Sequence, residues 1–310
     1  MDFLQLLAGF AILLAGGEFL IRGAIGLAER FGAPPLVIGL TVVAFGTSAP
    51  ELVVSLSAAF AGSGGIAIGN VVGSNIANVL LILALPSLLR PTPCVERGLR
   101  RSVLVMLGTT AVFMAMLSTG TLGRFDGLIL VAFLGAFTWY QLRVAREHAA
   151  NGATAEPDTP AGPLPALAVL VVAGLVCLPV GAEIAVRAAV RIAEALGVSQ
   201  AVIGLTIVAI GTSLPELAAS MVAAARGQST IALGNIIGSN IFNIACIMGI
   251  TATLFPLAVP DRMISFDMWA MALATIAAAG FVFLRRPIGR TGGLALLAGY
   301  CIYVLIAYAY

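Results

Sequence analysis

Long apolar stretches recur about every thirty residues along this chain, and each is long enough to cross the hydrocarbon core of a bilayer. Of the 310 residues, 60% are hydrophobic and only 10% are charged, whereas a soluble domain is about a quarter charged. Open sheets are excluded at membrane depth, because lipid cannot satisfy their unpaired backbone groups. The sequence therefore predicts an all-α polytopic membrane protein with lipid as most of its solvent. Its net charge of +2 says little about partners, but the positive charges lie in predicted loops and form no patch for nucleic acid.

The apolar stretches predict ten transmembrane helices. They cover roughly residues 3–28, 36–60, 66–89, 102–119, 125–146, 165–195, 201–225, 231–255, 266–285 and 291–309. Between the fifth and the sixth, HAANGATAEPDTPAGPL is typical of a flexible linker. We therefore expect a first five-helix repeat at residues 1–147, a cytoplasmic linker at 148–164 and a second, inverted five-helix repeat at 165–310.

An internal repeat at a fixed offset of 165 residues divides the chain. VIGLTVVAFGTSAPELVVS at 37–55 aligns without a gap on VIGLTIVAIGTSLPELAAS at 202–220, and IAIGNVVGSNIANV at 66–79 aligns on IALGNIIGSNIFNI at 231–244. Each half has five predicted spans, an odd number, so the second half enters the membrane from the opposite side. Equivalent residues are then related by a pseudo-two-fold axis in the membrane plane.

The arginines give an independent indication of orientation, because cytoplasmic loops carry an excess of basic residues. All 16 basic residues are arginine. With the N-terminus outside, only Arg124 and Arg262 fall in outer loops. The inner loops then hold Arg30, Arg90, Arg97, Arg100, Arg101, Arg143, Arg146, Arg226, Arg285, Arg286 and Arg290. We therefore expect both termini outside.

Pro50 and Pro215 interrupt two of the predicted helices at equivalent positions. Each lacks the N–H that would bond the carbonyl four residues back, at Gly46 or Gly211, and glycine makes local unwinding easy there. One such proline is often a structural kink. Here two such prolines are related by the repeat, and each is followed by an acid. They indicate backbone carbonyls without a helical partner, which must line a cavity or bind an ion because they cannot face lipid.

Those acids are Glu51 and Glu216, near the expected mid-depth of their helices. A carboxylate there costs at least ~2.5–3.5 kcal/mol on insertion scales, which points to function. Two facing carboxylates with carbonyl and hydroxyl oxygens make a hard site of charge −2, which suits Ca²⁺. The four cysteines and His148 are not placed to favour a softer metal.

Further polar side chains follow the same helical faces in both halves. They are Thr47, Ser48, Ser55, Asn70, Ser74 and Asn78 in the first, and Thr212, Ser213, Ser220, Asn235, Ser239 and Asn243 in the second. Hydroxyls and amides in membrane helices often only bond one helix to the next. Any one of these side chains alone could therefore either join two helices or belong to a polar site. The complete duplicated set favours a polar site.

Two more duplicated pairs, Glu18–Arg22 and Glu183–Arg187, lie in or near predicted spans at a separation of four residues. That order favours a local ion pair on a helix. We assign these pairs a structural or gating role and not substrate binding.

GTSAPE with GNVVGSNIAN, and GTSLPE with GNIIGSNIFN, resemble the duplicated alpha-repeats of the cation/Ca²⁺ exchanger superfamily, in particular its prokaryotic Na⁺/Ca²⁺ exchanger branch. The resemblance implies an antiporter of a prokaryotic plasma membrane, working by alternating access, that exchanges three Na⁺ for one Ca²⁺ as substrates and needs no cofactor or protein partner. Carried over by motif position, Ca²⁺ would be held by Glu51, Glu216 and the carbonyls of Thr47 and Thr212. Na⁺ sites would use Ala44, Ser48, Ser74, Ala209, Ser213 and Ser239, with Asn78 and Asn243 completing the centre.

Other readings stay open at this point. Some members of the superfamily that this chain resembles, including K⁺-dependent exchangers, carry an acid at the position of Asn243. With Asn at both 78 and 243, the predicted site holds two carboxylates and not three, which weakens the case for K⁺ cotransport. H⁺/Ca²⁺ exchangers usually place the key acid in a GNxxE-type motif, so proton coupling ranks second. A cation channel would also use Glu and carbonyls, although broken inverted repeats favour alternating access. An intramembrane enzyme is disfavoured because no nucleophile–base pair is evident.

Overall fold

The computed structural model describes residues 1–310 except 97, 151–161, 199–208 and 310. Within this part the regular elements are helices, apart from one short antiparallel pair, β1 (Thr121–Leu122) with β2 (Leu257–Ala258), and an isolated bridge between Thr92 and Ile288. In the strand pair Thr121 lies opposite Ala258. The predicted all-α membrane architecture is confirmed.

The described helices include four π-helical segments, labelled η, in which the backbone bond spans five residues. In chain order the elements are α1 (Asp2–Phe31), α2 (Pro35–Ile38), η1 (Gly39–Val43), α3 (Ala44–Thr47), α4 (Ala49–Phe60), α5 (Gly64–Ala77), η2 (Asn78–Ile82), α6 (Ala84–Leu89), α7 (Leu99–Leu117), α8 (Arg124–Ala150), α9 (Leu164–Ala195), α11 (Ala209–Gly211), α12 (Leu214–Ala225), α13 (Ser229–Phe242), η4 (Asn243–Met248), α14 (Gly249–Leu254), η5 (Met263–Asp267), α15 (Met268–Phe283) and α16 (Arg290–Ala309).

Eight described helices are long and apolar enough to cross a membrane, and a bent pair supplies a ninth span. The bent pair is Pro35–Thr47 with Ala49–Phe60, at an angle of 43°. Of the predicted seventh span, residues 201–208 lie outside the described part, and Leu214–Ala225 is a shorter apolar helix. The predicted spans therefore agree with the described helices to within a few residues, with one exception.

The exception is the fifth span, which was predicted to end at residue 146 and instead continues as α8 to Ala150. Part of the predicted linker is therefore helical. Residues 144–150 carry no glycine or proline to end the helix. Arg143 and Glu147 also form an ion pair one turn apart, with Nε–Oε1 at 2.7 Å, which supports the additional turn.

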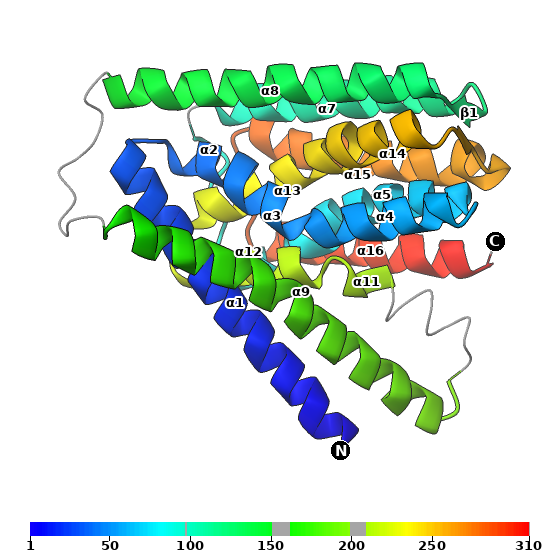
Figure 1. The fold of residues 1–310 in the computed structure, drawn as a ribbon, viewed down its shortest axis with the longest axis horizontal. Coiled ribbons are helices and arrows are strands. Elements are labelled where there is room, and N and C mark those ends of the chain that lie inside the picture. Colours follow the sequence, from blue (N-terminus) through cyan, green and yellow to red (C-terminus); the bar gives the residue numbers. More distant parts are fainter. Residues whose placement is uncertain (97, 151–161, 199–208, 310) are drawn as a thin grey trace.

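α1 and α9, the first helices of the two halves, cross side by side and diagonally to the other helices (Figure 1). Glycines bring their backbones together. A Cβ built at Gly16 would lie 2.9 Å from the backbone N of Leu178, and one at Gly181 would lie 2.7 Å from that of Leu13. Contacts nearer the C-terminus of α1 meet residues nearer the N-terminus of α9, so the two helices are antiparallel.

These contacts also obey the repeat. Gly181 is the equivalent of Gly16, and Leu178 is the equivalent of Leu13, at the offset of 165 residues. The contact of Gly16 with Leu178 is therefore the symmetry mate of the contact of Gly181 with Leu13. The antiparallel, self-equivalent crossing is what an inverted repeat requires.

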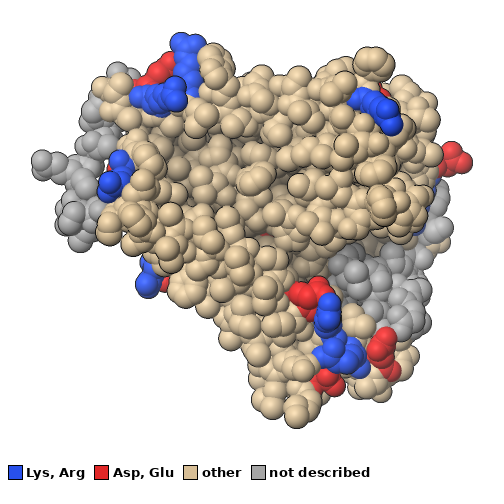
Figure 2. All heavy atoms as spheres, in the orientation of Figure 1, with Lys and Arg blue, Asp and Glu red and all other residues tan. Residues whose placement is uncertain are grey.

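Burial separates central from peripheral helices. The span Ser229–Leu254 is buried throughout and Gly64–Leu89 over most of its length, whereas Arg124–Ala150 and Arg290–Ala307 are mostly exposed. Large apolar side chains such as Trp269 and Leu273 lie on the outside. On the face shown in Figure 2, charged atoms gather near the margins and around the lower end of the tilted pair, and the broad surface between them is almost uncharged. That surface suits contact with lipid.

The close approach at Gly181 gives a first test. Gly181→Ala should lower the melting temperature of the purified protein in detergent, because an added methyl must push apart two backbones, a cost of about 1–3 kcal/mol for overpacking. The matched control is Gly135→Ala in α8, where, apart from its chain neighbours and the backbone of its own helix, no described atom lies within 4 Å of the added Cβ. That change should be neutral or slightly stabilising. Equal melting temperatures for the two variants would contradict the close crossing.

The inverted repeat can be tested at equivalent connections. Ser63 lies between α4 and α5, and its equivalent Gln228 lies between α12 and α13; both are partly exposed. Single cysteines at these positions, in protein without native cysteines, should react with an impermeant maleimide from opposite sides of the membrane. The arginine bias places Ser63 outside. Reaction of both from the same side would refute the inversion.

Candidate ion-binding site

Two helix breaks place Glu51 and Glu216 at the start of new helices. α3 ends at Thr47, Ser48 has φ −82° and ψ 2°, and α4 begins at Ala49. The second half repeats this at Ser213, with φ −89° and ψ 4°, before α12. Proline is tolerated in the first turn that follows, because its missing N–H has no intrahelical partner there. Each glutamate thus lies in a first turn, where the helix dipole favours negative charge.

Both carboxylates are buried and incompletely bonded. Glu51 is 0% exposed and Glu216 is 1% exposed. Within the described part of the chain, neither carboxylate oxygen of Glu51 has a hydrogen-bond partner, and Oε2 of Glu216 has none either. The two groups are also close enough to repel each other. A buried charge without a partner is strongly unfavourable, so this pair requires a cation or protons from outside the chain.

Neutral oxygens without partners accompany the carboxylates. Among the described residues, no hydrogen-bond partner is found for the side-chain amide of Asn78, for Oδ1 of Asn243 or for Oγ of Ser239. Asn78 and Asn243 are equivalent, and each begins a π-helical segment, η2 or η4. In η2 the N–H of Leu83 bonds the Asn78 carbonyl at 2.9 Å, five residues back. Such π-bulges often occur at functional sites, and here they begin at predicted ligands.

Other predicted polar residues bond one helix to its neighbour. Nδ2 of Asn70 donates to the Glu51 carbonyl at 3.2 Å and to Oγ of Ser55 at 3.0 Å. Nδ2 of Asn235 repeats this toward the Glu216 carbonyl, at 3.5 Å, and toward Ser220, at 3.1 Å. These four side chains therefore hold α4 on α5 and α12 on α13. For them the helix-bonding reading is the better one.

Three hydrogen bonds join predicted polar residues of one half to those of the other. Oγ of Ser48 donates to Oε1 of Glu216 at 3.1 Å, which brings together two predicted ligands from different repeats. Oγ of Ser213 donates to Oγ of Ser74 at 3.5 Å. Oγ1 of Thr47 donates to Oδ1 of Asn235 at 3.2 Å. The structure therefore gathers residues that are more than a hundred positions apart in the sequence.

Sequence reasoning missed Asn75 and Asn240, which are both buried. Nδ2 of Asn75 donates to the Asn240 carbonyl at 3.3 Å, and Nδ2 of Asn243 donates to Oδ1 of Asn75 at 3.0 Å. These bonds tie the centre of one repeat to that of the other. The signal was present, since both belong to the duplicated GSN triplet, but they lie beside the stripe formed by positions 70, 74 and 78.

The two helix breaks differ in the hydrogen bond that the serine N–H makes. The Ala44 carbonyl accepts the N–H of Ser48 at 3.1 Å and Oγ1 of Thr47 at 3.4 Å. In the second half, the N–H of Ser213 bonds the carbonyl of Ile210, three residues back, at 3.0 Å. The two breaks therefore share a sequence but differ in their hydrogen bonds.

A cavity of about 500 Å³ reaches the site from one end of the molecule. It is lined by Ile66 near the end that carries β1 and β2, and by Ser74 and Thr212 at the site. Thr212 borders this cavity, whereas its equivalent Thr47 is fully buried. Ser74 and Thr212 thus place the inner end of this cavity at the site.

The cavity wall holds a polar cluster that the sequence did not indicate. The hydroxyl of Tyr303 donates to Oδ1 of Asp267 at 3.1 Å, and Nε of Arg262 lies 3.3 Å from Oδ2 of the same carboxylate. This acid is paired, unlike Glu51 and Glu216. No group of three or more His, Cys, Asp and Glu side chains gathers among the described residues. The site thus offers two carboxylates with neutral oxygens, a donor set that suits Ca²⁺ and Na⁺.

Comparison with known proteins agrees with this chemistry. The profile of the family described as "Sodium/calcium exchanger protein" matches residues 1–143 and 166–309. Inner membrane protein YrbG of Escherichia coli is 36% identical, covering 98% of this chain and 95% of its own. Sodium/calcium exchanger MaX1 of Methanosarcina acetivorans is 31% identical, covering 99% of each chain.

Solved structures extend the similarity to the fold. The sodium-calcium exchanger NCX_Mj, soaked with 2.5 mM Na⁺ and 0.1 mM Ca²⁺, aligns with a TM-score of 0.82 at 32% identity, over 98% of this chain and 97% of that one. The match implies ten helices, of which one lies partly outside the described residues here. The chain therefore belongs to the sodium/calcium exchanger family, as a multi-pass membrane antiporter and not an enzyme.

Proposed function

We propose that this protein exchanges Ca²⁺ for Na⁺ through one shared site, with Glu51 and Glu216 as the ligands that both ions use. The observation that carries the proposal is the pair of buried carboxylates at equivalent helix breaks, whose oxygens mostly lack partners within the described chain. Two negative charges balance one Ca²⁺ without any basic residue. Support comes from NCX_Mj, a relative that was soaked with Na⁺ and Ca²⁺ or with Na⁺ and Sr²⁺.

The ligands we propose are oxygens that surround this pair. For Ca²⁺ they are the two carboxylates with the carbonyls of Thr47 and Thr212. For Na⁺ they are neutral oxygens of Ala44, Ser48, Ser74, Ala209, Ser213 and Ser239, with Asn78 and Asn243 completing the centre. The unpartnered oxygens of Ser239, Asn78 and Asn243 support this assignment. Ser48, which donates to Glu216, would turn its lone pairs toward an ion once that carboxylate binds a cation.

Alternating access is supported by the difference between the two halves. The cavity reaches Thr212 from one side, while Thr47 is buried. An inverted repeat can reach the opposite state when its halves exchange conformations around a fixed site. We place the protein in a prokaryotic plasma membrane with both termini outside and the linker cytoplasmic, so that Na⁺ entry would drive Ca²⁺ export. Proton coupling remains the second candidate.

Loss of one carboxylate should abolish Ca²⁺ transport. Glu51→Gln or Glu216→Gln leaves one negative charge for a doubly charged ion in a medium of low dielectric, where the imbalance is costly. Uptake of ⁴⁵Ca²⁺ into Na⁺-loaded proteoliposomes should therefore fall to near background. Glu147→Gln, which removes an exposed acid at the end of α8, is the matched control and should retain transport. Full uptake by either site variant, once shown to be folded, would disprove the site.

Transport should depend on Na⁺ and move charge. Exchange of three Na⁺ for one Ca²⁺ carries one net charge, and one charge across 100 mV is worth about 2.3 kcal/mol. In Na⁺-loaded proteoliposomes, Ca²⁺ uptake should speed up when valinomycin and inward K⁺ make the interior positive. Uptake should persist when a protonophore collapses the pH gradient while the potential is clamped. Uptake that needs a pH gradient but no Na⁺ would instead establish H⁺/Ca²⁺ exchange.

A further inference from the structure

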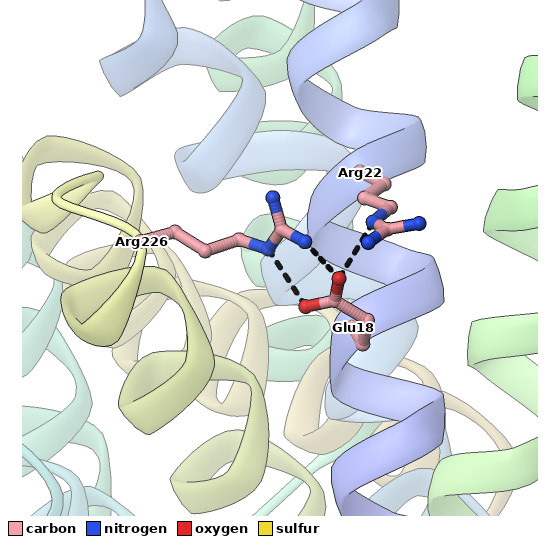
Figure 3. Close-up of polar contacts among 3 residues, drawn as sticks. All are labelled: Glu18, Arg22 and Arg226. Atoms are coloured by element: carbon pink, nitrogen blue, oxygen red, sulfur yellow. Dashed lines mark hydrogen bonds and ion pairs between the residues drawn. The ribbon is translucent and has the colours of Figure 1, made fainter.

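A branched ion pair connects α1 with the end of α12. Glu18 of α1 pairs with Arg22 one turn later, with Nε–Oε1 at 2.6 Å, as the sequence predicted. It also pairs with Arg226, which directly follows α12 (Figure 3). Nε of Arg226 donates to Oε2 at 2.7 Å, and its Nη2 contacts Oε1. An arginine fork of this kind is the more specific form of ion pair. α12 begins with the turn that carries Glu216, so the fork links α1 to a helix of the site.

Only one arm of this cluster is duplicated. Glu183 and Arg187 are the equivalents of Glu18 and Arg22, and they form the same local pair, with Nε–Oε1 at 2.5 Å. The position equivalent to Arg226 is Ala61, which cannot make an ion pair. The arm between helices therefore belongs to one half of the protein alone.

The packing around this arm is equally one-sided. α1 packs along α12, and a Cβ at Gly17 would lie 3.2 Å from the Ala218 carbonyl. Among the described residues, the equivalent helices α9 and α4 show no comparable packing. Equivalent side chains differ too, since Ile66 of α5 is 62% exposed and Ile231 of α13 is 1% exposed. The two repeats therefore hold different conformations about their pseudo-two-fold axis.

The opposite access state follows from symmetry, and this step rests on the proposed alternating access. When the repeats exchange conformations, α1 leaves α12 and α9 takes the equivalent place along α4. Glu183 then faces Ala61, and no ion pair replaces the one that was lost. By contrast, the crossing of α1 with α9 maps onto itself and persists in both states. The pair between Arg191 of α9 and Asp2 of α1, with Nε–Oδ1 at 2.7 Å, belongs to that persistent crossing.

We propose that Glu18 and Arg226 are positioning residues that bias the exchanger toward the state in which α1 lies along α12. The pair does not touch the ion, and it stabilises one access state over the other. Its side chains are 29% and 34% exposed. An ion pair with that exposure should favour its state by between about twofold and about fivefold. The populations of the two access states are thus shifted by an interaction that the repeat lacks in its second copy.

Two cysteine reporters can measure that bias in proteoliposomes, in protein without native cysteines. Ile66→Cys reports the present state, and Ile231→Cys should become reactive from the opposite side in the exchanged state. With Arg226→Gln, we expect labelling of the cysteine at 66 to slow and labelling at 231 to speed up, each by between about twofold and about fivefold. Glu18 keeps Arg22, so this variant leaves no buried carboxylate unpaired.

Asp2→Asn is the matched control, because it breaks an ion pair of α1 that persists in both states. It should change neither labelling rate.

A gain-of-function variant adds an independent check. Ala61→Arg places an arginine where Glu183 should arrive in the exchanged state, so it should shift both rates in the same sense as Arg226→Gln. Ala61 is exposed, and the change should therefore leave the fold intact.

The outcomes separate the two proposals. Labelling at 231 that never occurs in the otherwise unaltered chain, under any Na⁺ or Ca²⁺ condition, would contradict alternating access itself. Labelling at 231 that occurs but does not respond to Arg226→Gln or Ala61→Arg would overturn the role of the ion pair alone. Rates at 66 and 231 that rise or fall together would also overturn it, because general loosening and not a shift between states would be the cause.

Discussion

The structure depends on two carboxylates that the chain itself does not neutralise. Glu51 and Glu216 are buried and repel each other, and three of their four carboxylate oxygens have no described hydrogen-bond partner. Such a pair is unstable unless a cation or protons join it. The fold lowers that cost by ending a helix just before each acid, so that each lies in a positively polarised first turn. At the same breaks, the hydroxyls of Ser48 and Ser213 bond to residues of the opposite half. Binding of a cation or of protons is therefore the condition under which this core is stable.

The inverted repeat explains why the pair forms at all. One broken helix supplies one carboxylate, and the symmetry mate supplies the second from the opposite side of the membrane. Asn75 joins the halves at the centre, because its side-chain amide donates to the Asn240 carbonyl and accepts from the Asn243 amide. The self-equivalent crossing of α1 and α9, made possible by glycines, connects the halves at the periphery. Away from these two connections the halves differ in conformation, because α1 packs along α12 whereas α9 does not pack comparably along α4 among the described residues. The ion pair of Glu18 with Arg226 lies at this one-sided contact.

Much of this could be predicted from sequence, because periodicity and duplication are local signals. The spans follow from apolar length, and the breaks follow from proline placed before an acid in both halves. The helix-bonding role of Asn70 and Asn235 could not be separated from ion binding, since both functions use the same side chains. The pairing of Glu18 with Arg226 could not be predicted either, because residues 208 positions apart meet only through the packing of α1 on α12. Symmetry predicts what the halves share, and it carries no information on which half holds which conformation.

The central claim is that Ca²⁺ and Na⁺ use one shared pair of carboxylates, and equilibrium competition tests it most directly. Titration calorimetry of the purified protein in detergent would measure the apparent Kd for Ca²⁺ at rising Na⁺, with ionic strength held constant by a large organic cation. If the ions share Glu51 and Glu216, the apparent Kd should rise more steeply than the first power of the Na⁺ concentration, because several Na⁺ displace one Ca²⁺. An apparent Kd that stays constant or levels off as Na⁺ rises would show that both ions bind at once, and it would contradict a shared site.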